Sequence, residues 1–572
     1  MVQCQAGGFR QSPIVRRAEH FPNKVPMCPQ KLKLGLLLDS FKVPAWIYGV
    51  IQRIAAENSG EFSLVVLNDG KTGPAPVGKN TIVYSLFNRL DEKLFTKEPN
   101  PFAPKNAAEI LSGTPLIKVT PLRNGNVSFI SEADAEKIRE YQLDILIQFG
   151  FEHLDLESLN ASKYGTWFYY HGDDRIMKGG PPGFWEVVEN WSETGSALLS
   201  AGGSSPLNRV LFRSHFVTYP LSPARHRSYY FWATTSFLPR QVSLLQQMGE
   251  ERFCQEVEKY NAALLREVRN YEAPSNFTAI KSIAKLTIRL AGEILHRLFY
   301  FDQWFLLFSF KQDISDTLCE FHRLMPPRDK FWADPHAIQS GDRYYIFIEE
   351  FLQHKNKGHI SVIELDDSGN WKSPVKVLEK DYHLSYPFIF KWKDRVYMVP
   401  ESRANKTIDL YECADFPYKW EFKKCLMDNI SAVDTTLFHH ANKWWLFTGI
   451  AENRAAAPNV ELFLYYTDDL FNGEWTSHPH NPIVSDVKSA RPAGSVFVKD
   501  GKLFRPSQDC SKTYGYGFDL NEIVTLSETE YRESRVVSIR PSWDKKIKAT
   551  HTFASCGNLT VIDAFTKTRK VW

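Results

Sequence analysis

Acidic and basic side chains recur at the openings of five aromatic-rich segments in the second half of the chain. The segments read WADPHAIQSGDRYYIFIEE, SYPFIFKWKDRVYMVPES, AVDTTLFHHANKWWLFTG, ARPAGSVFVKDGKLFRPSQD and THTFASCGNLTVIDAF. Each continues as a strand, a turn and an aromatic strand. Their markers Asp334, Pro387, Asp434, Arg491 and His551 are 53, 47, 57 and 60 residues apart, which suits one four-stranded propeller blade each. The pattern predicts five blades, with a strand at residues 304–310 that closes the ring.

The opening motifs should converge, because the first strand of each propeller blade lines the central channel. Carboxylates that meet in a funnel suit glycosidic bond cleavage, in which one protonates the leaving oxygen and another acts as base or nucleophile. The candidates for this chemistry are Asp334, Asp434 and Glu401. The candidates for binding a sugar are His336, Tyr386, Arg491, Asp509 and His551. The structural alternative is that the carboxylates only cap turns or brace strands, with Arg491 as their ion-pair partner.

A second candidate site lies in the first half of the chain, between residues 143 and 195. A strand there ends at His171, and ligands bind outside the carboxyl ends of parallel strands. Asp173 and Asp174 follow directly, so that His171 could act as a base that one of them orients. The turn and helix that come next contribute Gly179, Gly180 and Trp185 as substrate-binding candidates, since glycine lets backbone approach a ligand closely. The alternative is a domain without catalytic activity.

The elements around these motifs divide the chain into four parts. We expect a disordered tail over residues 1–30, an α/β domain over 31–235, a helical linker over 236–300 and a five-bladed β-propeller over 301–572. Apolar strands at 34–39, 62–68 and 143–150, with a helix at 46–56, predict βαβ units and a mostly parallel sheet. Residues 280–298 form a basic amphipathic pattern that fits either an anionic membrane surface or a neighbouring domain.

The composition narrows the class of protein. The 572 residues are 43% hydrophobic and 24% charged, as in globular chains, and a net charge of +3 gives no reason to expect a nucleic-acid partner. The eight cysteines include no C-x-x-C pair, so we expect neither a disulfide framework nor a metal site. We find no secretory signal and no apolar run as long as a spanning helix. We therefore expect a cytoplasmic protein and leave peripheral membrane association open.

The propeller segments also resemble two known families. The five-bladed pattern and the Asp-Pro opening are similar to family-43 glycoside hydrolases, which implies a base at Asp334 and a second carboxylate at Asp434. That family's acid in the fourth blade has no counterpart, because Arg491 stands there and Glu401 lies in the second blade. The strings HLSYPFIF, YMVPES, VDTTLFHHANKWW and LFRPSQDCSKTYG resemble the propeller region of plant glucosamine inositolphosphorylceramide transferases. This second resemblance covers residues 332–533 and implies a propeller associated with glycan assembly.

Residues 33–216 resemble the formyltransferase fold of methionyl-tRNA and sugar N-formyltransferases. His171 matches the catalytic histidine of that family, and the string KGGPPGFW matches the segment that follows it. The resemblance implies a Rossmann-like formyltransferase domain. The family's asparagine is replaced by Tyr169, so two readings stay open. One is formyl transfer to a sugar with N10-formyl-tetrahydrofolate as donor, and the other is a different transfer, with a nucleotide sugar as donor.

Three functions are consistent with these features. We favour a transferase of glycan or glycolipid biosynthesis, such as surface polysaccharide assembly. In it the formyltransferase-like domain acts on a sugar and the propeller binds the carbohydrate or glycolipid. One alternative is a glycoside hydrolase that uses the propeller carboxylates, and the other is a non-catalytic carbohydrate-binding protein. Two regions that both resemble parts of biosynthetic enzymes favour the transferase.

Overall fold

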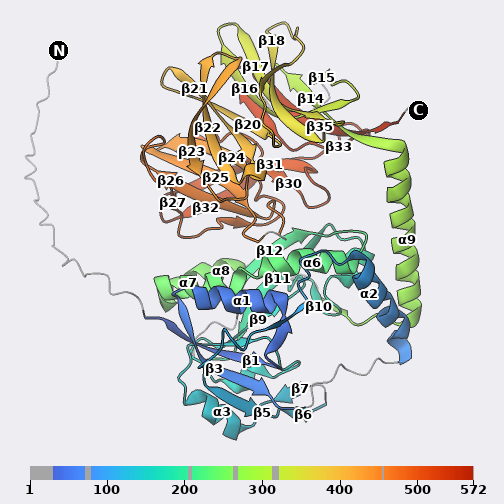
Figure 1. Cartoon of the computed structure of the whole chain (residues 1–572), viewed down its shortest axis with the longest axis vertical. Helices are drawn as coiled ribbons and strands as arrows, with labels where there is room; N and C mark the ends of the chain where they lie inside the picture. Colours follow the sequence, from blue (N-terminus) through green and yellow to red (C-terminus); the bar gives the residue numbers. More distant parts are fainter. Residues whose placement is uncertain are drawn as a thin grey trace, which may run out of the picture.

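The computed structural model describes residues 30–70, 79–125, 127–203, 209–261, 268–311, 321–453 and 456–570. Of the predicted tail, residues 1–29 lie outside the described residues. The chain forms an α/β body and a β-propeller, and the long helix α9 (Asn276–Phe299) runs from one to the other (Figure 1). Among the described residues, no helix is long and apolar enough to cross a membrane. Cys413, Cys425, Cys510 and Cys556 are free thiols.

A seven-stranded sheet forms the centre of the α/β body, in the order β12-β11-β9-β8-β1-β3-β5. Its strands are β1 (Leu32–Leu38), β3 (Gly60–Asn68), β5 (Leu116–Val119), β8 (Ile145–Gln148), β9 (Thr166–Tyr170), β11 (Glu193–Ala201) and β12 (Val210–Val217). The five strands from β9 to β5 run parallel to one another, whereas β11 runs antiparallel to both of its neighbours, β9 and β12. The predicted strands and the parallel sheet are confirmed, within a mixed sheet. The formyltransferase fold itself remains a prediction.

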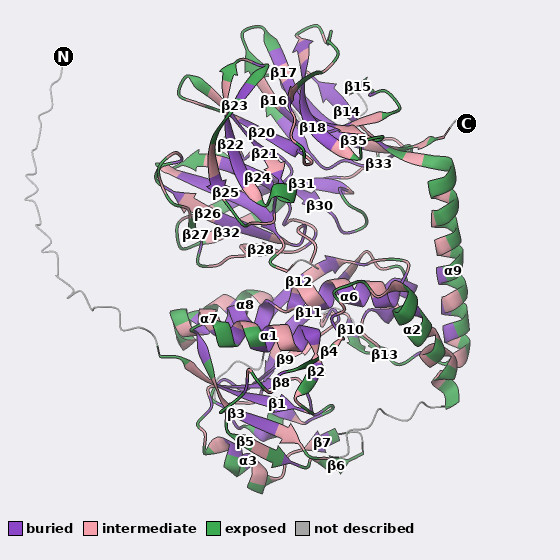
Figure 2. Ribbon diagram, viewed as in Figure 1, coloured by how far each residue is buried: buried purple, intermediate pink, exposed green. Residues whose placement is uncertain are grey.

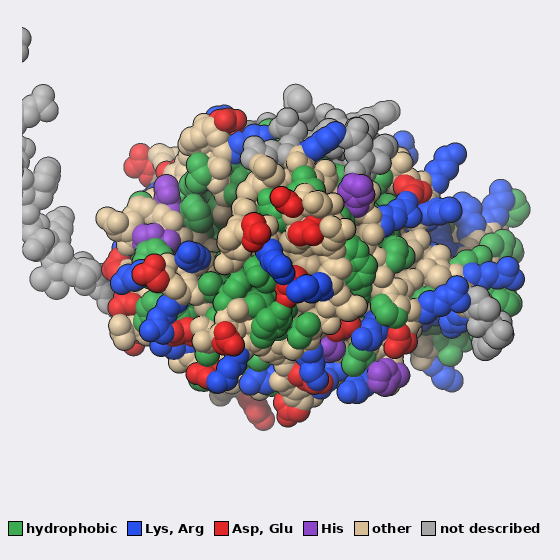
Figure 3. All heavy atoms as spheres, turned by 90° about the horizontal axis from the view of Figure 1, so that it is seen from above, with side chains coloured by type: hydrophobic (Ala, Val, Ile, Leu, Met, Phe, Trp, Pro, Cys, Tyr) green, Lys and Arg blue, Asp and Glu red, His purple; other side chains and the backbone are tan. Residues whose placement is uncertain are grey.

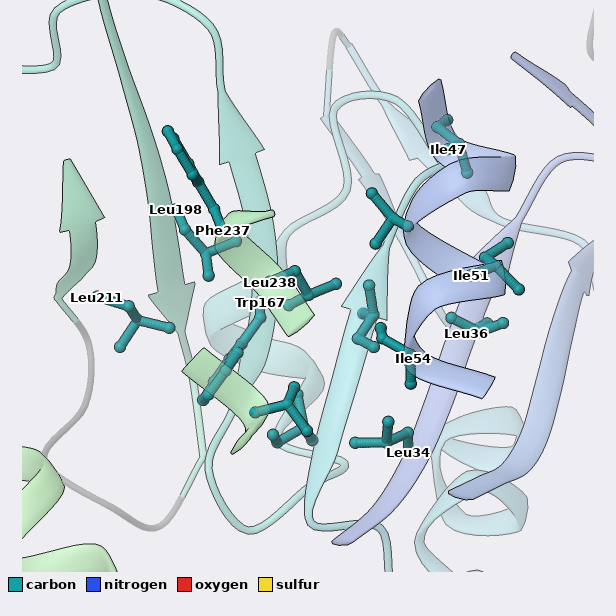
Figure 4. Close-up of a cluster of buried hydrophobic side chains, with 14 of the residues drawn as sticks. Leu34, Leu36, Ile47, Ile51, Ile54, Trp167, Leu198, Leu211, Phe237 and Leu238 are labelled. Atoms are coloured by element: carbon teal, nitrogen blue, oxygen red, sulfur yellow. The ribbon is translucent and has the colours of Figure 1, made fainter. Parts of the chain in front are cut away.

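Both faces of this sheet are covered, which explains its continuous apolar strands. On one face α1 (Ala45–Ala56) and α7 (Phe237–Met248) pack against β1, and Figure 4 shows Ile47, Ile51 and Leu238 within that cluster. On the other face α3 (Glu132–Arg139) and α4 (Leu156–Leu159) pack against alternate residues of the same strands. Because α7 and α8 (Glu250–Asn261) belong to this body, α9 is the part of the predicted linker 236–300 that connects the two bodies.

The remaining elements of the α/β body are short or peripheral. Its other helices are η1 (Lys79–Thr81), α2 (Ile82–Phe95), α5 (Phe184–Val188) and α6 (Pro223–Thr234). Three two-stranded sheets pair β2 (Lys42–Pro44) with β4 (Pro104–Asn106), β6 (Leu122–Asn124) with β7 (Val127–Phe129), and β10 (Met177–Gly179) with β13 (Arg269–Tyr271).

The second half of the chain is a five-bladed propeller, as predicted. Blade 1 contains β16 (Lys330–Ser340), β17 (Arg343–Leu352), β18 (Lys357–Asp366) and β19 (Val375–Leu378). Blade 2 contains β20 (Ser385–Trp392), β21 (Arg395–Ser402), β22 (Thr407–Asp415) and β23 (Lys419–Met427), with η3 (Arg403–Asn405) between β21 and β22. Blade 3 contains β24 (Ala432–His440), β25 (Lys443–Ile450), β26 (Glu461–Thr467) and β27 (Thr476–Ser477), with β28 (Val484–Ser485) beside β26.

The last two blades complete the ring. Blade 4 contains β29 (Phe497–Lys499), β30 (Lys502–Asp509), β31 (Gly517–Leu526) and β32 (Tyr531–Ile539). Blade 5 contains β34 (Phe553–Cys556), β35 (Leu559–Arg569), β14 (Tyr300–Ser309) and β15 (His322–Leu324), with β33 (Ile547–Ala549) also on β35. The pairing of β14 with β35 joins the two ends of the propeller sequence. The predicted closing strand is therefore confirmed.

The α/β body contacts the propeller near the end of β25, which is the second strand of blade 3. Arg240 pairs with Glu461 at 2.6 Å and with Glu452 at 2.9 Å, both next to the loop that follows β25. The Val487 N–H, just before the fourth opening motif, donates to the His215 carbonyl at 3.1 Å. The opening motifs of blades 3 and 4 therefore lie near the junction of the two bodies.

Candidate functional site

A backbone bulge recurs in the first strand of three blades. The strand register shifts between Ala333 and His336 in β16, and equivalent shifts occur in β20 and β24. Each bulge contains a non-glycine residue in the left-handed region, namely Asp334 (φ 52°), Tyr386 (φ 41°) and Asp434 (φ 49°). Such a conformation costs of order 1–3 kcal/mol and is concentrated at functional sites. Because the same bulge with a left-handed residue recurs in three blades, we take the opening motifs as a candidate functional site rather than as ordinary turns.

The first cluster joins blades 1 and 5 around His551. Its Nε2 lies 3.0 Å from Asp334 Oδ1, and its Nδ1 lies 2.9 Å from Asp563 Oδ2. The Thr552 hydroxyl donates to Asp334 at 3.1 Å. Burial alone would lower the pKa of His551, but the Asp563 and Asp334 carboxylates outweigh it and raise that pKa well above its usual value. The cluster therefore holds an imidazolium between two carboxylates.

The same three residues could each offer one ligand atom to a metal ion, since those atoms lie within 4.8 Å of one another. In the observed geometry the ring nitrogens of His551 face the two carboxylates directly. The imidazolium then supplies the positive charge that a metal ion would bring, and we assign no metal here.

The second cluster joins blades 2, 3 and 4 around Arg491. Its Nε and Nη2 donate to the two oxygens of Asp434 at 2.6 and 3.1 Å, and Gln508 Nε2 donates to the same carboxylate at 2.8 Å. Glu401 lies 3.6 Å from Arg491 and is hydrogen-bonded to the Asp434 side chain. Burial, followed by the neighbouring Asp434 charge, raises the pKa of Glu401 well above its usual value. Burial also raises the pKa of Asp434, so the pair favours holding one proton between its two carboxyl groups. The Asp434 N–H also donates to Glu401 at 3.3 Å.

Two further candidates lie between the clusters. The Tyr386 N–H donates to Asp334 at 3.2 Å, and its hydroxyl is hydrogen-bonded to Thr436 at 2.9 Å. The His336 ring packs edge-on against Tyr386 at 4.6 Å, and burial lowers the pKa of His336 to about 4. The structure thus brings together seven of the eight propeller candidates. The exception is Asp509, whose side chain pairs with Arg540 at 2.8 Å and accepts the Ser511 N–H.

Glu349 is a site residue that the sequence reasoning missed. It is buried, and it pairs across strands with the residue before Asp334, as Glu401 pairs with the residue before Tyr386. Burial, followed by the Asp334 and Glu401 charges, raises its pKa well above the usual value. Its signal was available, because Glu349 ends the second strand of blade 1 as Glu401 ends that of blade 2.

The clusters are closed in this structure. Asp334 is 4% exposed, Asp434 1%, His551 2% and Arg491 9%. Their hydrogen-bonding groups are largely engaged by one another. A sugar would reach them only past the side chains that surround the mouth.

In the α/β body the predicted catalytic group does not assemble. The His171 ring packs against four other rings, those of Trp46, Tyr169, Tyr230 and Phe231, and the Phe231 ring lies 3.8 Å away. Its Nδ1 is hydrogen-bonded to the Ser196 hydroxyl at 3.3 Å. Burial lowers the pKa of His171 to about 3. The expectation that Asp173 or Asp174 orients His171 is wrong, because each of these carboxylates binds an arginine instead.

Those arginines are close neighbours in the fold. Asp173 accepts from Arg175 at 2.8 Å, and Asp174 accepts from Arg213 at 2.6 Å. An ion pair with a rigid, bidentate guanidinium is stronger than a hydrogen bond to a neutral imidazole. The carboxylates therefore stabilise the turn after β9 and do not face the histidine.

The predicted substrate-binding residues of this body pack against β13 instead. Gly179 and Gly180 have φ values of 73° and 79°, and a Cβ on either would lie under 3 Å from Tyr271. Trp185 Nε1 donates to the Glu272 carbonyl at 2.9 Å. The glycines serve close approach of two protein segments, so the structure gives no evidence that they approach a ligand.

Comparison with known proteins finds relatives of the propeller. Residues 319–559 match the family model described as "Glucosamine inositolphosphorylceramide transferase 1, N-terminal". Glucosamine inositolphosphorylceramide transferase 1 of Oryza sativa subsp. japonica is 36% identical over 206 residues, which are 36% of this chain and 27% of that protein. The Arabidopsis thaliana protein of that name is 34% identical over 209 residues, with the same coverage.

Solved structures give weaker matches. The catalytic domain of a GH62 α-L-arabinofuranosidase from Coprinopsis cinerea is 14% identical, covers 42% of this chain and 92% of its own, and has a TM-score of 0.31. An α-L-arabinanase of Penicillium chrysogenum is 17% identical, with coverages of 42% and 77% and a TM-score of 0.30. These scores support no argument about function. The chain is similar to the plant transferases over its propeller, and it spans about a quarter of their length.

Proposed function

We propose that this chain is a transferase of glycolipid assembly whose propeller binds the polar head of the lipid. The observation that carries the proposal is that the family match over residues 319–559 contains all five opening motifs, and with them the second charged cluster and all of the first except Asp563. The lipid that the relatives' name contains, inositolphosphorylceramide, is the first acceptor to test. Its phosphate and ring hydroxyls suit a mouth that combines an arginine, carboxyl groups and aromatic rings.

Hydrolysis is the weaker alternative. Glycosidases keep their two carboxyl groups roughly 5–9.5 Å apart so that a sugar or a water fits between them. Glu401 and Asp434 are instead hydrogen-bonded to each other, and Arg491 also donates to Asp434. A pair in mutual contact leaves no room for a glycosidic oxygen. A purely carbohydrate-binding propeller is the second candidate. It is favoured because the charged residues within each buried cluster are already paired with one another.

We keep formyl transfer outside the proposal. Tyr169, at the position of the formyltransferase asparagine, accepts the Leu238 N–H at 3.2 Å and is enclosed by other rings. His171 beside it is neutral and covered by Phe231. A nucleotide sugar is therefore the donor class to test before N10-formyl-tetrahydrofolate.

A glycolipid acceptor would require contact with a membrane surface, and two helices offer one. On α9 the exposed apolar side chains include Phe277, Ile280, Ile288, Ile294, Leu295 and Leu298, and on α2 they are Ile82, Leu86, Leu90 and Leu94. Figure 2 shows α9 largely exposed, and Figure 3 shows hydrophobic, Lys and Arg side chains together on that side of the molecule. Exposed apolar stripes flanked by cations suit an anionic bilayer surface. We propose that α9 rests on such a surface.

The test is a transfer assay with the full chain. Vesicles that contain inositolphosphorylceramide are incubated with a panel of nucleotide sugars, and the lipids are read by mass spectrometry. We expect one glycosylated product, lost in the Asp434→Asn variant and kept in Lys391→Ala, a change at an exposed lysine elsewhere on the propeller. Retention of the lipid without a product would support the binding protein, and release of sugar from a glycosylated lipid would support the hydrolase.

A further inference from the structure

A cavity of about 890 Å³ lies where α9 meets the propeller. Its walls are the last turns of α9, the start of β14, the 512–516 loop of blade 4, β33 and the end of β35. The volume lies in the range of roughly 300–1,000 Å³ that is typical of small-molecule sites. Neither cluster described above lines it, so its chemistry is a separate observation.

The charge of this cavity is positive. Its cations are Arg297, Lys512, Lys548, Lys567 and Lys570, and its acids are Glu293 and Asp302. Arg297 pairs with Glu293 at 3.0 Å, whereas the four lysines form no ion pair with any acid among the described residues. Lys512, Lys548 and Lys570 each donate one hydrogen bond, to the Tyr516 hydroxyl, the Lys545 carbonyl and the Arg297 carbonyl. Ammonium groups that no carboxylate neutralises still concentrate anions in a concave wall. The cavity is therefore suited to a ligand that carries at least one phosphate.

Aromatic rings form the inner end of the cavity and connect it to the first cluster. Trp304 lies 4.3 Å from the His551 ring, and Tyr514 lies 5.2 Å from it. The guanidinium of Arg491 lies 5.0 Å from the Tyr514 ring. Trp304 is half-buried and Tyr514 is exposed, so both rings also face outward. Flat apolar rings beside carboxylates suit the C–H face and the hydroxyls of a cyclic polyol.

We infer that this cavity binds a phosphorylated sugar or cyclitol, with the phosphate on Lys548 and Lys567 and the ring on Trp304 and Tyr514. The inference deepens the proposed function and rests on it for the source of the ligand, namely a lipid headgroup. In this orientation the ring lies next to the residues that enclose His551. The exposed apolar residues Ile294, Leu295 and Leu298 lie in the same last turns of α9 as Glu293, His296 and Arg297, which line the cavity, so a lipid in the bilayer surface could present its headgroup there.

The test measures binding of inositol 1-phosphate to the full chain by calorimetry, with inositol and inorganic phosphate as separate arms. Lys548 and Lys567 are exposed, so the double change Lys548→Ala/Lys567→Ala should leave the fold intact. We expect it to weaken binding at least about tenfold, because charge-assisted hydrogen bonds to phosphate are lost. Trp304→Leu should weaken the binding of inositol 1-phosphate without affecting that of inorganic phosphate. Lys391→Ala should change the binding of neither ligand.

The outcomes separate this inference from the proposed function. Unchanged affinity in the double lysine variant, or equal affinity for inorganic phosphate and inositol 1-phosphate, would overturn the cavity assignment. Glycolipid transfer at the wild-type rate in that variant would overturn it too, while leaving the proposed function standing. Binding as expected with no lipid transfer would support the cavity and count against the transferase. Vesicle-embedded inositolphosphorylceramide that competes with inositol 1-phosphate would identify the lipid headgroup as the source.

Discussion

Replacement of Arg491 by Met tests whether the second cluster is held together by the buried charge pair. Arg491 is 9% exposed and Asp434 1%, and two hydrogen bonds of 2.6 and 3.1 Å join them. The variant leaves the Asp434 carboxylate buried without its cation, which costs about 3–5 kcal/mol. For a propeller of about 270 residues that unfolds as one unit, that loss corresponds to a fall in its Tm of roughly 5–9 °C.

The double variant Arg491→Met/Asp434→Asn removes both charges. Replacing a buried ion pair as a whole is often close to neutral, so we expect it to recover most of the loss, with a coupling energy of about 2–4 kcal/mol. Burial raises the pKa of Glu401, so its carboxyl group favours the neutral form in this variant and adds no buried charge. Calorimetric or urea unfolding of the four proteins measures the cycle.

A loss of less than about 1 kcal/mol in the Arg491→Met variant, or two single losses that simply add, would show that the buried charge pair does not hold the second cluster together. Additivity would mean that Arg491 acts through the Tyr514 ring, 5.0 Å away, rather than through Asp434. The matched control is Arg505→Met, which breaks a buried pair with Glu533 in blade 4, away from the mouth. It should destabilise the chain without changing ligand binding.

Three further predictions concern other parts of the molecule. Burial raises the pKa of Glu186 from 4.5 to about 7, and neither carboxyl oxygen makes a well-formed hydrogen bond. Because the folded state keeps a proton that the unfolded state releases, the stability of the wild type falls between about pH 4.5 and 7. Urea titrations should therefore show Glu186→Gln about 3 kcal/mol more stable than the wild type at pH 8 and equally stable at pH 4. Gly494→Ala should destabilise the propeller by about 2 kcal/mol or more, because its Cβ would lie 2.0 Å from the Phe553 carbonyl oxygen; an unchanged Tm would contradict this. Ile288→Ser, at a side chain that is 73% exposed, should weaken flotation with anionic vesicles severalfold, whereas Val498→Ser on blade 4 should not, and equal flotation of both variants would remove α9 from the membrane contact.

The five blades could be read from local sequence because each one repeats the same local pattern. Aromatic and β-branched runs, short turns and a polar opening motif recur at nearly constant spacing, and each predicts a strand without knowledge of its partners. The same locality explains why Glu401 was found. Glu349 was missed because the strand-end rule was applied to blades 2 and 4 and not to blade 1.

The apolar periodicity of residues 280–298 predicted a helix but not its environment. Both a docked and an exposed amphipathic helix have that periodicity. In the structure Ala279, Ser282 and Leu286 are buried, while Ile288 and its neighbours on that face are exposed. Only a narrow face of α9 is therefore buried. Which face that is depends on how the α/β body packs against the helix, and the periodicity of the sequence does not specify this.

His171 shows the opposite limit. Its place at the end of a parallel strand suggested an open site, and the strand is where it was expected. Its ring is nevertheless covered by Trp46 of α1 and Phe231 of α6, which are distant in sequence. Once covered, an imidazole loses its charge, because burial penalises the charged form.

What the sequence determined by itself is therefore the set of strands, their grouping into five blades and the residue types that open each blade, all of which depend on neighbours within a few positions. Only the tertiary structure decided that His551 meets Asp334 and Asp563, and that Arg491 pairs with Asp434. The contact between His551 and Asp334 exists because β14 and β35 close the ring and place blade 5 beside blade 1. The contact between Arg491 and Asp434 likewise requires blades 3 and 4 to meet at the axis. The charge of a buried group depends on such neighbours, and sequence alone does not specify which blades meet at the axis.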